Sequence, residues 1–81
     1  MEYHQYLLDA GAQPGKRYLA ASLAAVIVGG DSGWLAAQYK EAWHALDAVA
    51  VGAVAEVQDP SGIVWCCRRV DSMRWIVVGA Y

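Results

Sequence analysis

The residues of this chain that could do chemistry are two cysteines, two histidines and one glycine-rich segment. Cys66 and Cys67 carry thiols, and a thiolate can act as a nucleophile or bind a metal ion. Neither His4 nor His44 stands at metal-ligand spacing from them. His44 follows Lys40 by about one helical turn, but no motif ties a nucleophile to it. The sequence therefore predicts no metal site, no cofactor and no enzymatic activity.

The glycine-rich segment 29–33 reads Gly-Gly-Asp-Ser-Gly and precedes a helical pattern. Backbone amides at a helix N-terminus can hold an anion. The segment lacks the Gly-Lys-Ser/Thr ending of a Walker motif and the Gly-x-Gly-x-x-Gly spacing of a dinucleotide site. Asp31 would also repel a phosphate. We interpret residues 31–33 as a helix cap and turn.

The cysteines also bear on the cellular compartment. Adjacent residues of a strand point to opposite faces, so a disulfide between Cys66 and Cys67 would be strained. Reduced thiols are typical of the cytosol, and we expect a cytoplasmic protein. The N-terminus lacks the pattern of a signal peptide. The apolar run 19–30 is much shorter than the roughly 20 residues that span a bilayer. We therefore expect a soluble protein without membrane contact.

A basic and aromatic cluster near the C-terminus raises the question of nucleic acid binding. Arg68, Arg69 and Arg74 lie near Trp65 and Trp75 in the sequence, and such residues can stack on bases. The net charge is −2, and the six basic residues are scattered along the chain. Affinity for nucleic acid depends on neutralising phosphates, so we expect no direct nucleic acid contact.

The composition favours a protein-binding role. The chain is 58% hydrophobic and 17% charged, with four tryptophans and five tyrosines in 81 residues. A domain of this size buries only about 60% of its unfolded surface. So much apolar surface does not fit within one small core. We expect part of it to meet another protein or a second copy of the chain.

The N-terminal half predicts one or two helices. In residues 17–28 the apolar positions follow one helical face, although the end of this segment would also fit a buried strand; we favour the helix. Residues 34–47 have a clearer helical pattern. Its apolar stripe contains Leu35, Tyr39, Ala42, Trp43 and Leu46. Residues 3–8 fit either a strand or a helical turn, and the role of residues 1–16 stays open.

The C-terminal part predicts an antiparallel meander of three strands at 53–58, 63–70 and 74–81. Residues 59–62 (Asp-Pro-Ser-Gly) form a type I turn signature, and residues 71–73 form the second turn. The expected fold is a single α+β domain over residues 1–81, with one or two helices packed on the three-stranded sheet.

The second hairpin allows two registers. A two-residue turn would set Arg69 opposite Arg74, and like charges in that position are destabilising. A three-residue turn sets Arg69 opposite Trp75, where the guanidinium can stack on the indole for about 0.5–1 kcal/mol. We favour the second register, which also pairs Trp65 with Gly79 and Cys67 with Val77.

Carried through the first hairpin, this register divides the side chains between two faces. We expect the aliphatic face to pack under the helices; it holds Ala55, Val57, Val64, Cys66, Val70, Ile76 and Val78, with Arg68 and Arg74 near its edges. The other face holds Val54, Glu56, Ile63, Trp65, Cys67, Arg69, Trp75, Val77 and Tyr81. Neither face is polar, although an antiparallel sheet usually has one solvated face. Trp, Tyr and Arg dominate binding hot spots. The predicted partner-binding residues are Glu56, Trp65, Arg69, Trp75 and Tyr81.

The C-terminal third also resembles a known family. Segments 52–54 (Gly-Ala-Val), 62–65 (Gly-Ile-Val-Trp) and 74–76 (Arg-Trp-Ile), together with Val57, are similar to the terminal meander of a small phage-encoded anti-CRISPR family. That family is directed at type I surveillance complexes and places a helix before three antiparallel strands. The alanine-rich N-terminal half departs from its pattern, and no contact residues carry over. The resemblance implies an inhibitor, acting in the host cell cytoplasm, that occupies the surface of a CRISPR effector subunit.

We therefore expect a non-enzymatic protein-binding inhibitor or regulator, encoded by a phage or mobile element. The alternative is a homo-oligomeric domain with a structural or small-ligand-binding role. If the contact face is as predicted, replacing Trp75 and Arg69 by alanine abolishes binding and leaves the fold intact. Unfolding of both variants would instead place these residues in the core.

Overall fold

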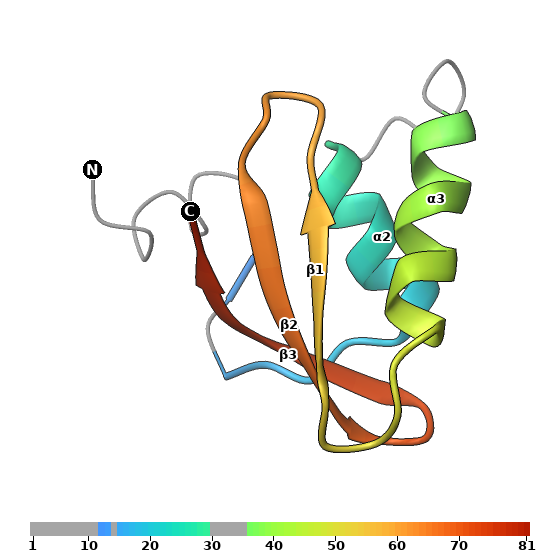
Figure 1. Ribbon diagram of the computed structural model, residues 1–81, viewed down its shortest axis with the longest axis vertical. Helices are drawn as coiled ribbons and strands as arrows, with labels where there is room; N and C mark the ends of the chain where they lie inside the picture. The colour runs from blue at the N-terminus through green and yellow to red at the C-terminus, as the bar shows by residue number, and fades with distance from the viewer. Residues whose placement is uncertain (1–11, 14, 30–35) are drawn as a thin grey trace.

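The computed structural model describes residues 12–13, 15–29 and 36–81. Its elements, in chain order, are α2 (Ala20–Val28), α3 (Ala36–Asp47), β1 (Val54–Gln58), β2 (Val64–Asp71) and β3 (Arg74–Ala80). The strands form one antiparallel sheet in the order β1-β2-β3 (Figure 1). This confirms the predicted α+β fold class. No helix in the described parts of the chain is long and apolar enough to cross a membrane.

Several predictions concern residues that the structure does not describe. The undecided segment 3–8, most of the glycine-rich segment 29–33 and the beginning of the helix predicted at 34–47 lie outside the described residues. The helix cap predicted at 31–33 is among these residues.

Helix α2 confirms the helical interpretation of residues 17–28 over most of that segment. It begins after Leu19, which is extended, and ends at Gly29, which has a φ of 94°. The N–H of Gly29 bonds back to the carbonyls of Ala25 and Val26. Only a residue without a Cβ adopts this left-handed conformation without strain, so the glycine terminates the helix. Leu23 is fully buried against the sheet.

Helix α3 confirms the predicted stripe in part. Ala42 and Leu46 are buried, and Tyr39 is partly buried against the core. Trp43 is 38% exposed and packs edge-to-face on Tyr39, with 5.7 Å between the ring centroids. Trp43 therefore lies at the exposed margin of the predicted stripe. Ala45 packs against the core.

The loop of the first hairpin is one residue longer than the predicted division of the faces requires. The N–H of Gly62 bonds to the carbonyl of Asp59 at 3.0 Å, as a type I turn requires. Gly62 itself has a φ of 95°, and the strands meet again at Asp59 and Ile63. This is a three-residue loop in which a left-handed glycine adds a bulge. As a result Ala55 pairs with Cys67, not with Cys66.

The second hairpin confirms most of the predicted register. Arg69 pairs with Trp75, and Cys67 pairs with Val77. A register shift next to Cys67 places Trp65 opposite Ala80, not the predicted Gly79. A second irregularity lies between Arg69 and Asp71.

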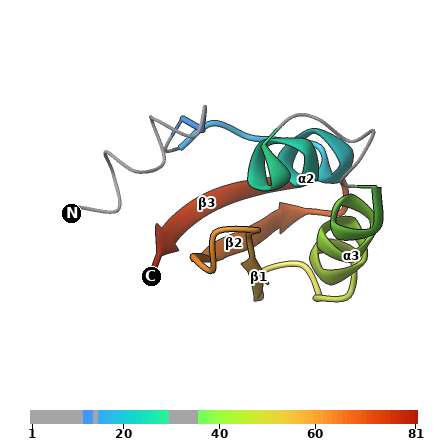
Figure 2. The same ribbon diagram turned by 90° about the horizontal axis from the view of Figure 1, so that it is seen from above.

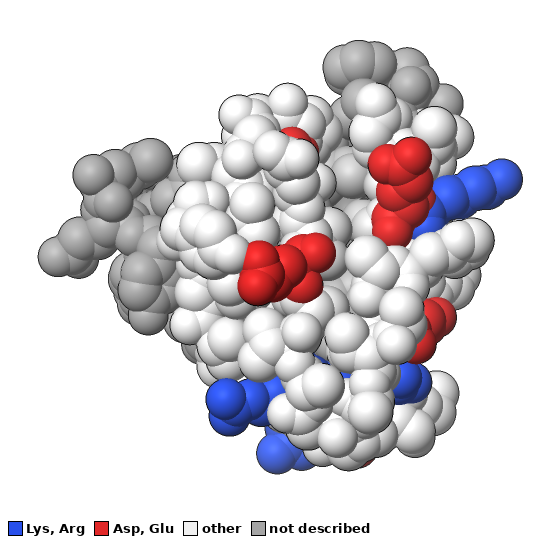
Figure 3. Space-filling view, in the orientation of Figure 1, with Lys and Arg blue, Asp and Glu red and all other residues white. Residues whose placement is uncertain are grey.

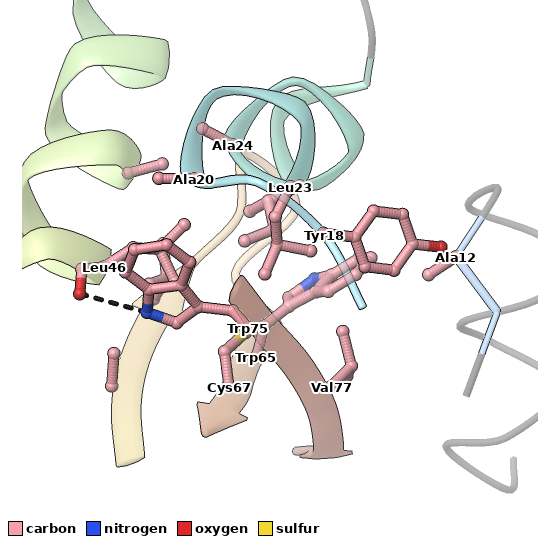
Figure 4. Close-up of a cluster of buried hydrophobic side chains, with 14 of the residues drawn as sticks. Ala12, Tyr18, Ala20, Leu23, Ala24, Leu46, Trp65, Cys67, Trp75 and Val77 are labelled. Atoms are coloured by element: carbon pink, nitrogen blue, oxygen red, sulfur yellow. Dashed lines mark hydrogen bonds between the residues drawn. The ribbon is translucent and has the colours of Figure 1, made fainter. Parts of the chain in front are cut away.

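The helices lie on one side of the sheet (Figure 2). The side chains of α2 and α3 that face the strands meet the inner side of the sheet in a single core (Figure 4). The buried apolar side chains are Ala12, Tyr18, Ala20, Leu23, Ala24, Ile27, Val28, Ala42, Leu46, Ala55, Val57, Trp65, Cys67, Trp75 and Val77.

Candidate protein-binding surface

The two central tryptophans lie in the core, between the sheet and the helices (Figure 4). Trp65 is 0% exposed and Trp75 is 2% exposed. The indole N–H of Trp75 donates to the carbonyl of Leu46 at 3.2 Å, and that of Trp65 donates to the Asp59 carboxylate at 3.0 Å. Both rings are therefore buried with their polar atoms satisfied. The prediction that they lie on an exposed face is wrong.

The extra turn residue is one reason for this error, because it changes which side of the sheet the β1 side chains occupy. Side chains alternate along a strand, so a shift of one residue moves a whole strand's side chains to the other face. Because Gly62 adds a residue to the turn, Ala55 and Val57 lie on the same side as Trp65 and Cys67. The predicted grouping of Trp65, Cys67, Trp75 and Val77 on one side was correct, but this side is the inner one.

The second reason concerns which face of the sheet the helices cover. Beside Leu23 and Leu46, the buried helix residues include three small ones, Ala20, Ala24 and Ala42. Large rings on a sheet pack well against small residues on a helix, because together they fill the space between the layers. The alanine-rich N-terminal half was thus a usable signal that the tryptophans face the helices.

Arg69 also belongs to the inner side. Its guanidinium lies 4.7 Å from the centre of the Trp75 ring, which confirms the predicted stacking. Its Nη1 donates to the carbonyl of Val49 at 2.8 Å, and its Nη2 donates to that of Ser72 at 2.7 Å. The side chain therefore ties the loop after α3 to the turn between β2 and β3.

Of the five predicted partner-binding residues, Glu56 and Tyr81 meet on the outer side of the sheet. Tyr81 is 68% exposed, and its hydroxyl donates to the Glu56 carboxylate. This hydrogen bond is the main cause of the raised pKa of Tyr81. The bond joins the end of the chain to the middle of β1, and both groups remain open to solvent.

The outer side of the sheet is apolar although no described element covers it. Val54 is 41% exposed and Val78 is 38% exposed. In the view of Figure 3 uncharged atoms cover most of this side, with basic groups gathered toward the end near the β2–β3 turn. We call this side the outer face; it comprises Val54, Glu56, Val64, Cys66, Arg68, Ile76, Val78 and Tyr81.

The adjacent cysteines divide between the two faces. Both are free thiols, Cys66 half-buried on the outer face and Cys67 fully buried in the core. Burial raises the pKa of Cys67 to about 12, with a further contribution from Cys66. Burial and the negative charge of Glu56 also raise the pKa of Cys66. Protonated thiols are weak nucleophiles. In the described part of the chain, no three His, Cys, Asp or Glu residues gather closely enough to hold a metal ion.

An apolar depression that the sequence analysis did not predict lies where both helices approach the β2–β3 turn. It has a volume of about 280 Å³, and Leu19, Trp43 and Met73 are among its lining residues. Leu19 is 44% exposed and Met73 is 61% exposed. Helical spacing grouped Trp43 with the apolar stripe of its own helix and gave no indication that it lies near Leu19 and Met73.

No protein-family model matches the chain, and no curated protein or solved structure shows significant similarity to it.

Proposed function

We propose that the protein is a non-enzymatic inhibitor or regulator that acts by occupying the surface of another protein with its outer face. The observation that carries the proposal is the exposure of Val54 and Val78 on the uncovered side of the sheet. Antiparallel sheets with one free side usually place polar residues on it. Apolar side chains gathered on one exposed face are typical of a protein interaction site.

The pair of Tyr81 and Glu56 supports a binding role at the margin of this face. Tyrosine is enriched among the residues that contribute most to protein interfaces. The hydrogen bond from the Tyr81 hydroxyl to Glu56 holds an exposed ring in place. A side chain that is already positioned loses less conformational entropy when a partner binds.

The resemblance to the anti-CRISPR family supplies the first partner class to test. It suggests a phage-encoded inhibitor that covers a subunit of a type I surveillance complex in the host cytoplasm. Two free cysteines are compatible with a reducing compartment. The mechanism requires only that the inhibitor exclude another molecule from the covered surface.

Self-association is the second candidate, and the charges on the outer face favour it. Glu56 in β1 and Arg68 in β2 are both exposed on this face. In a dimer with two-fold symmetry the same face meets itself, so each Glu56 could approach Arg68 of the other copy. Such a dimer would cover the same apolar side chains.

An affinity-capture comparison tests the proposal. The intact chain, Val78→Lys and the control Val51→Lys would each be immobilised and offered a purified type I surveillance complex and a bacterial lysate. Val51 is 57% exposed in the loop before β1. We expect the wild type and Val51→Lys to retain the same partner, and Val78→Lys to lose it.

Light scattering on the free protein separates the two candidates. A monomer with a captured partner supports the inhibitor, whereas a dimer that Val78→Lys dissociates supports self-association. If Val78→Lys captures the partner as well as the wild type does, the outer face is not the contact surface.

A further inference from the structure

The two edges of the sheet differ in how their backbone groups are paired. At the β3 edge, Tyr18 and Trp75 exchange two backbone hydrogen bonds of 2.8 Å. At the β1 edge, no described residue pairs with the strand on the side away from β2. A strand edge with unpaired groups is a template for another extended chain.

The register identifies the free groups of β1. The N–H of Arg69 bonds to the carbonyl of Ala53, and the N–H of Asp59 bonds to that of Ile63. Hydrogen-bonded pairs alternate along an antiparallel ladder, so the odd-numbered residues of β1 bond to β2. The backbone N–H and C=O groups of Val54, Glu56 and Gln58 therefore point away from the sheet.

Among the described residues this edge has only part of the usual protection. Natural proteins discourage pairing at an edge with short strands, charged side chains (lysine above all), proline, a bulge or a covering segment. Strand β1 reads Val-Ala-Glu-Val-Gln and contains no lysine or proline, and its pairing with β2 is regular. Glu56 is its single charged residue.

A groove runs along the same edge, between β1 and α3. It has a volume of about 350 Å³. Figure 2 shows α3 at the margin of the sheet beside β1. Ala42, Ala45 and Val57 supply apolar surface to the groove. The alanine methyl groups are short, so a neighbouring chain can approach the helix closely.

The groove is acidic. Glu41 lines it and is exposed, and Asp59 lies at its end. Glu56 borders the groove from β1, and its carboxylate lies on the outer face, where it bonds to Tyr81. Asp59 already accepts hydrogen bonds from the Trp65 indole and from Ser61. No lysine or arginine lines the groove. Its charge is therefore complementary to a cationic segment.

We propose that the groove between β1 and α3 binds an extended, basic segment of the partner protein, which adds to the sheet as a fourth strand beside β1. The inference rests on the proposed protein-binding function and adds the kind of segment that the protein takes. Backbone hydrogen bonds to Val54, Glu56 and Gln58 supply affinity, and alternate side chains supply specificity. One set of side chains faces α3, where the alanines favour small or apolar residues and Glu41 favours a lysine or arginine. The other set lies on the outer face, where Glu56 favours a second basic residue.

The charge of β1 argues against a second copy of β1 as the added strand. In a symmetric β1–β1 pairing centred on Glu56, the Glu56 side chains of both copies would lie opposite one another on the outer face. Like charges on neighbouring strands are destabilising. A basic segment of another protein meets no such repulsion.

Peptide selection on the intact protein provides the test. Random twelve-residue peptides would be displayed and selected at low salt, and a synthetic copy of the best peptide would be titrated by fluorescence anisotropy. We expect enriched sequences with alternating basic and apolar residues, and affinity that falls as salt rises. Hydrogen exchange should slow at the amides of Val54, Glu56 and Gln58 when the peptide binds.

Matched variants separate the backbone contribution from the charge. Glu56→Gln removes the charge alone, and Glu56→Pro also removes the outward N–H, which β2 does not use. Proline is tolerated at such edge positions. We expect Glu56→Pro to bind about tenfold more weakly than Glu56→Gln, as the loss of one hydrogen bond implies. Glu41→Gln should weaken binding severalfold, whereas Lys40→Gln, outside the groove, should not weaken it.

Three results would overturn the inference: no enriched peptide, an enriched peptide without basic residues, or peptide binding that Glu56→Pro and Glu41→Gln leave unchanged. Circular dichroism would show whether Glu56→Pro is folded. If it is not, peptide binding by Glu41→Gln and the hydrogen-exchange data test the inference instead. Val78→Lys should bind the peptide normally. If Val78→Lys loses partner capture but still binds the peptide, the outer face contacts the partner. If the groove variants lose peptide binding, the groove binds the peptide.

Discussion

The inner and outer faces of the sheet are both apolar, but they differ in what accompanies the apolar groups. On the inner face, the indoles of Trp65 and Trp75 have hydrogen-bond acceptors and lie beneath the helices. On the outer face, Val54 and Val78 are exposed beside charged side chains. Burial thus follows the complementarity of two layers and the pairing of polar atoms, and hydrophobicity alone does not determine it.

The largest expected effect comes from removing a ring of the inner face. Trp65→Ala would lose a fully buried indole and leave Asp59 without one of its donors, so we expect about 3–5 kcal/mol of destabilisation. Urea denaturation measures this change. Trp43→Ala is the matched control on the exposed side of α3, with an expected cost near 1 kcal/mol or less, about that of a surface aromatic pair. Equal losses of unfolding free energy in the two variants would contradict the burial of Trp65 and the exposure of Trp43.

The neighbouring arginines sharpen the comparison, because Arg69 is on the inner face and Arg68 is on the outer face. Arg69→Ala would lose the stacking on Trp75 and the bonds to Val49 and Ser72. We expect it to cost about 2–3 kcal/mol of unfolding free energy. Arg68→Ala should change that energy by less than about 0.5 kcal/mol. A larger cost for Arg68→Ala would contradict the assignment of the faces.

The two cysteines test the same contrast chemically. Iodoacetamide reacts with the thiolate, so in the native protein we expect slow labelling of Cys66 and none of Cys67. The pKa of Cys66 is raised, so its labelling rate should keep increasing as the pH passes the ordinary thiol value. Cys67, with its pKa near 12, should react only after unfolding. Mass spectrometry of Cys66→Ser and Cys67→Ser distinguishes the sites, and native labelling of Cys66→Ser would contradict the burial of Cys67.

Local chemistry in the sequence predicted much of the fold. The two turns and the stacking of Arg69 on Trp75 were both inferred from neighbouring residue types. These features depend on short-range geometry, which composition and spacing report well. The three strands and their antiparallel order followed from the same signals.

The faces were harder to predict, because they depend on one residue in a turn. The signature at 59–62 indicates a type I turn but does not show whether Gly62 belongs to the strand or to the loop. With Gly62 in the loop, the side chains of β1 change sides. The candidate surface changed accordingly: Trp65, Arg69 and Trp75 belong to the inner side, while Glu56 and Tyr81 remain outside.

The most direct test of the outer face is a paired measurement on Val78→Lys. The side chain is 38% exposed and serves no described part of the core, so the substitution should change the unfolding free energy by less than about 0.5 kcal/mol. The same variant should lose at least tenfold in affinity for the captured partner, as expected for a charge placed in an apolar interface. A variant that unfolds, or one that binds the partner with unchanged affinity, would contradict the role proposed for this face.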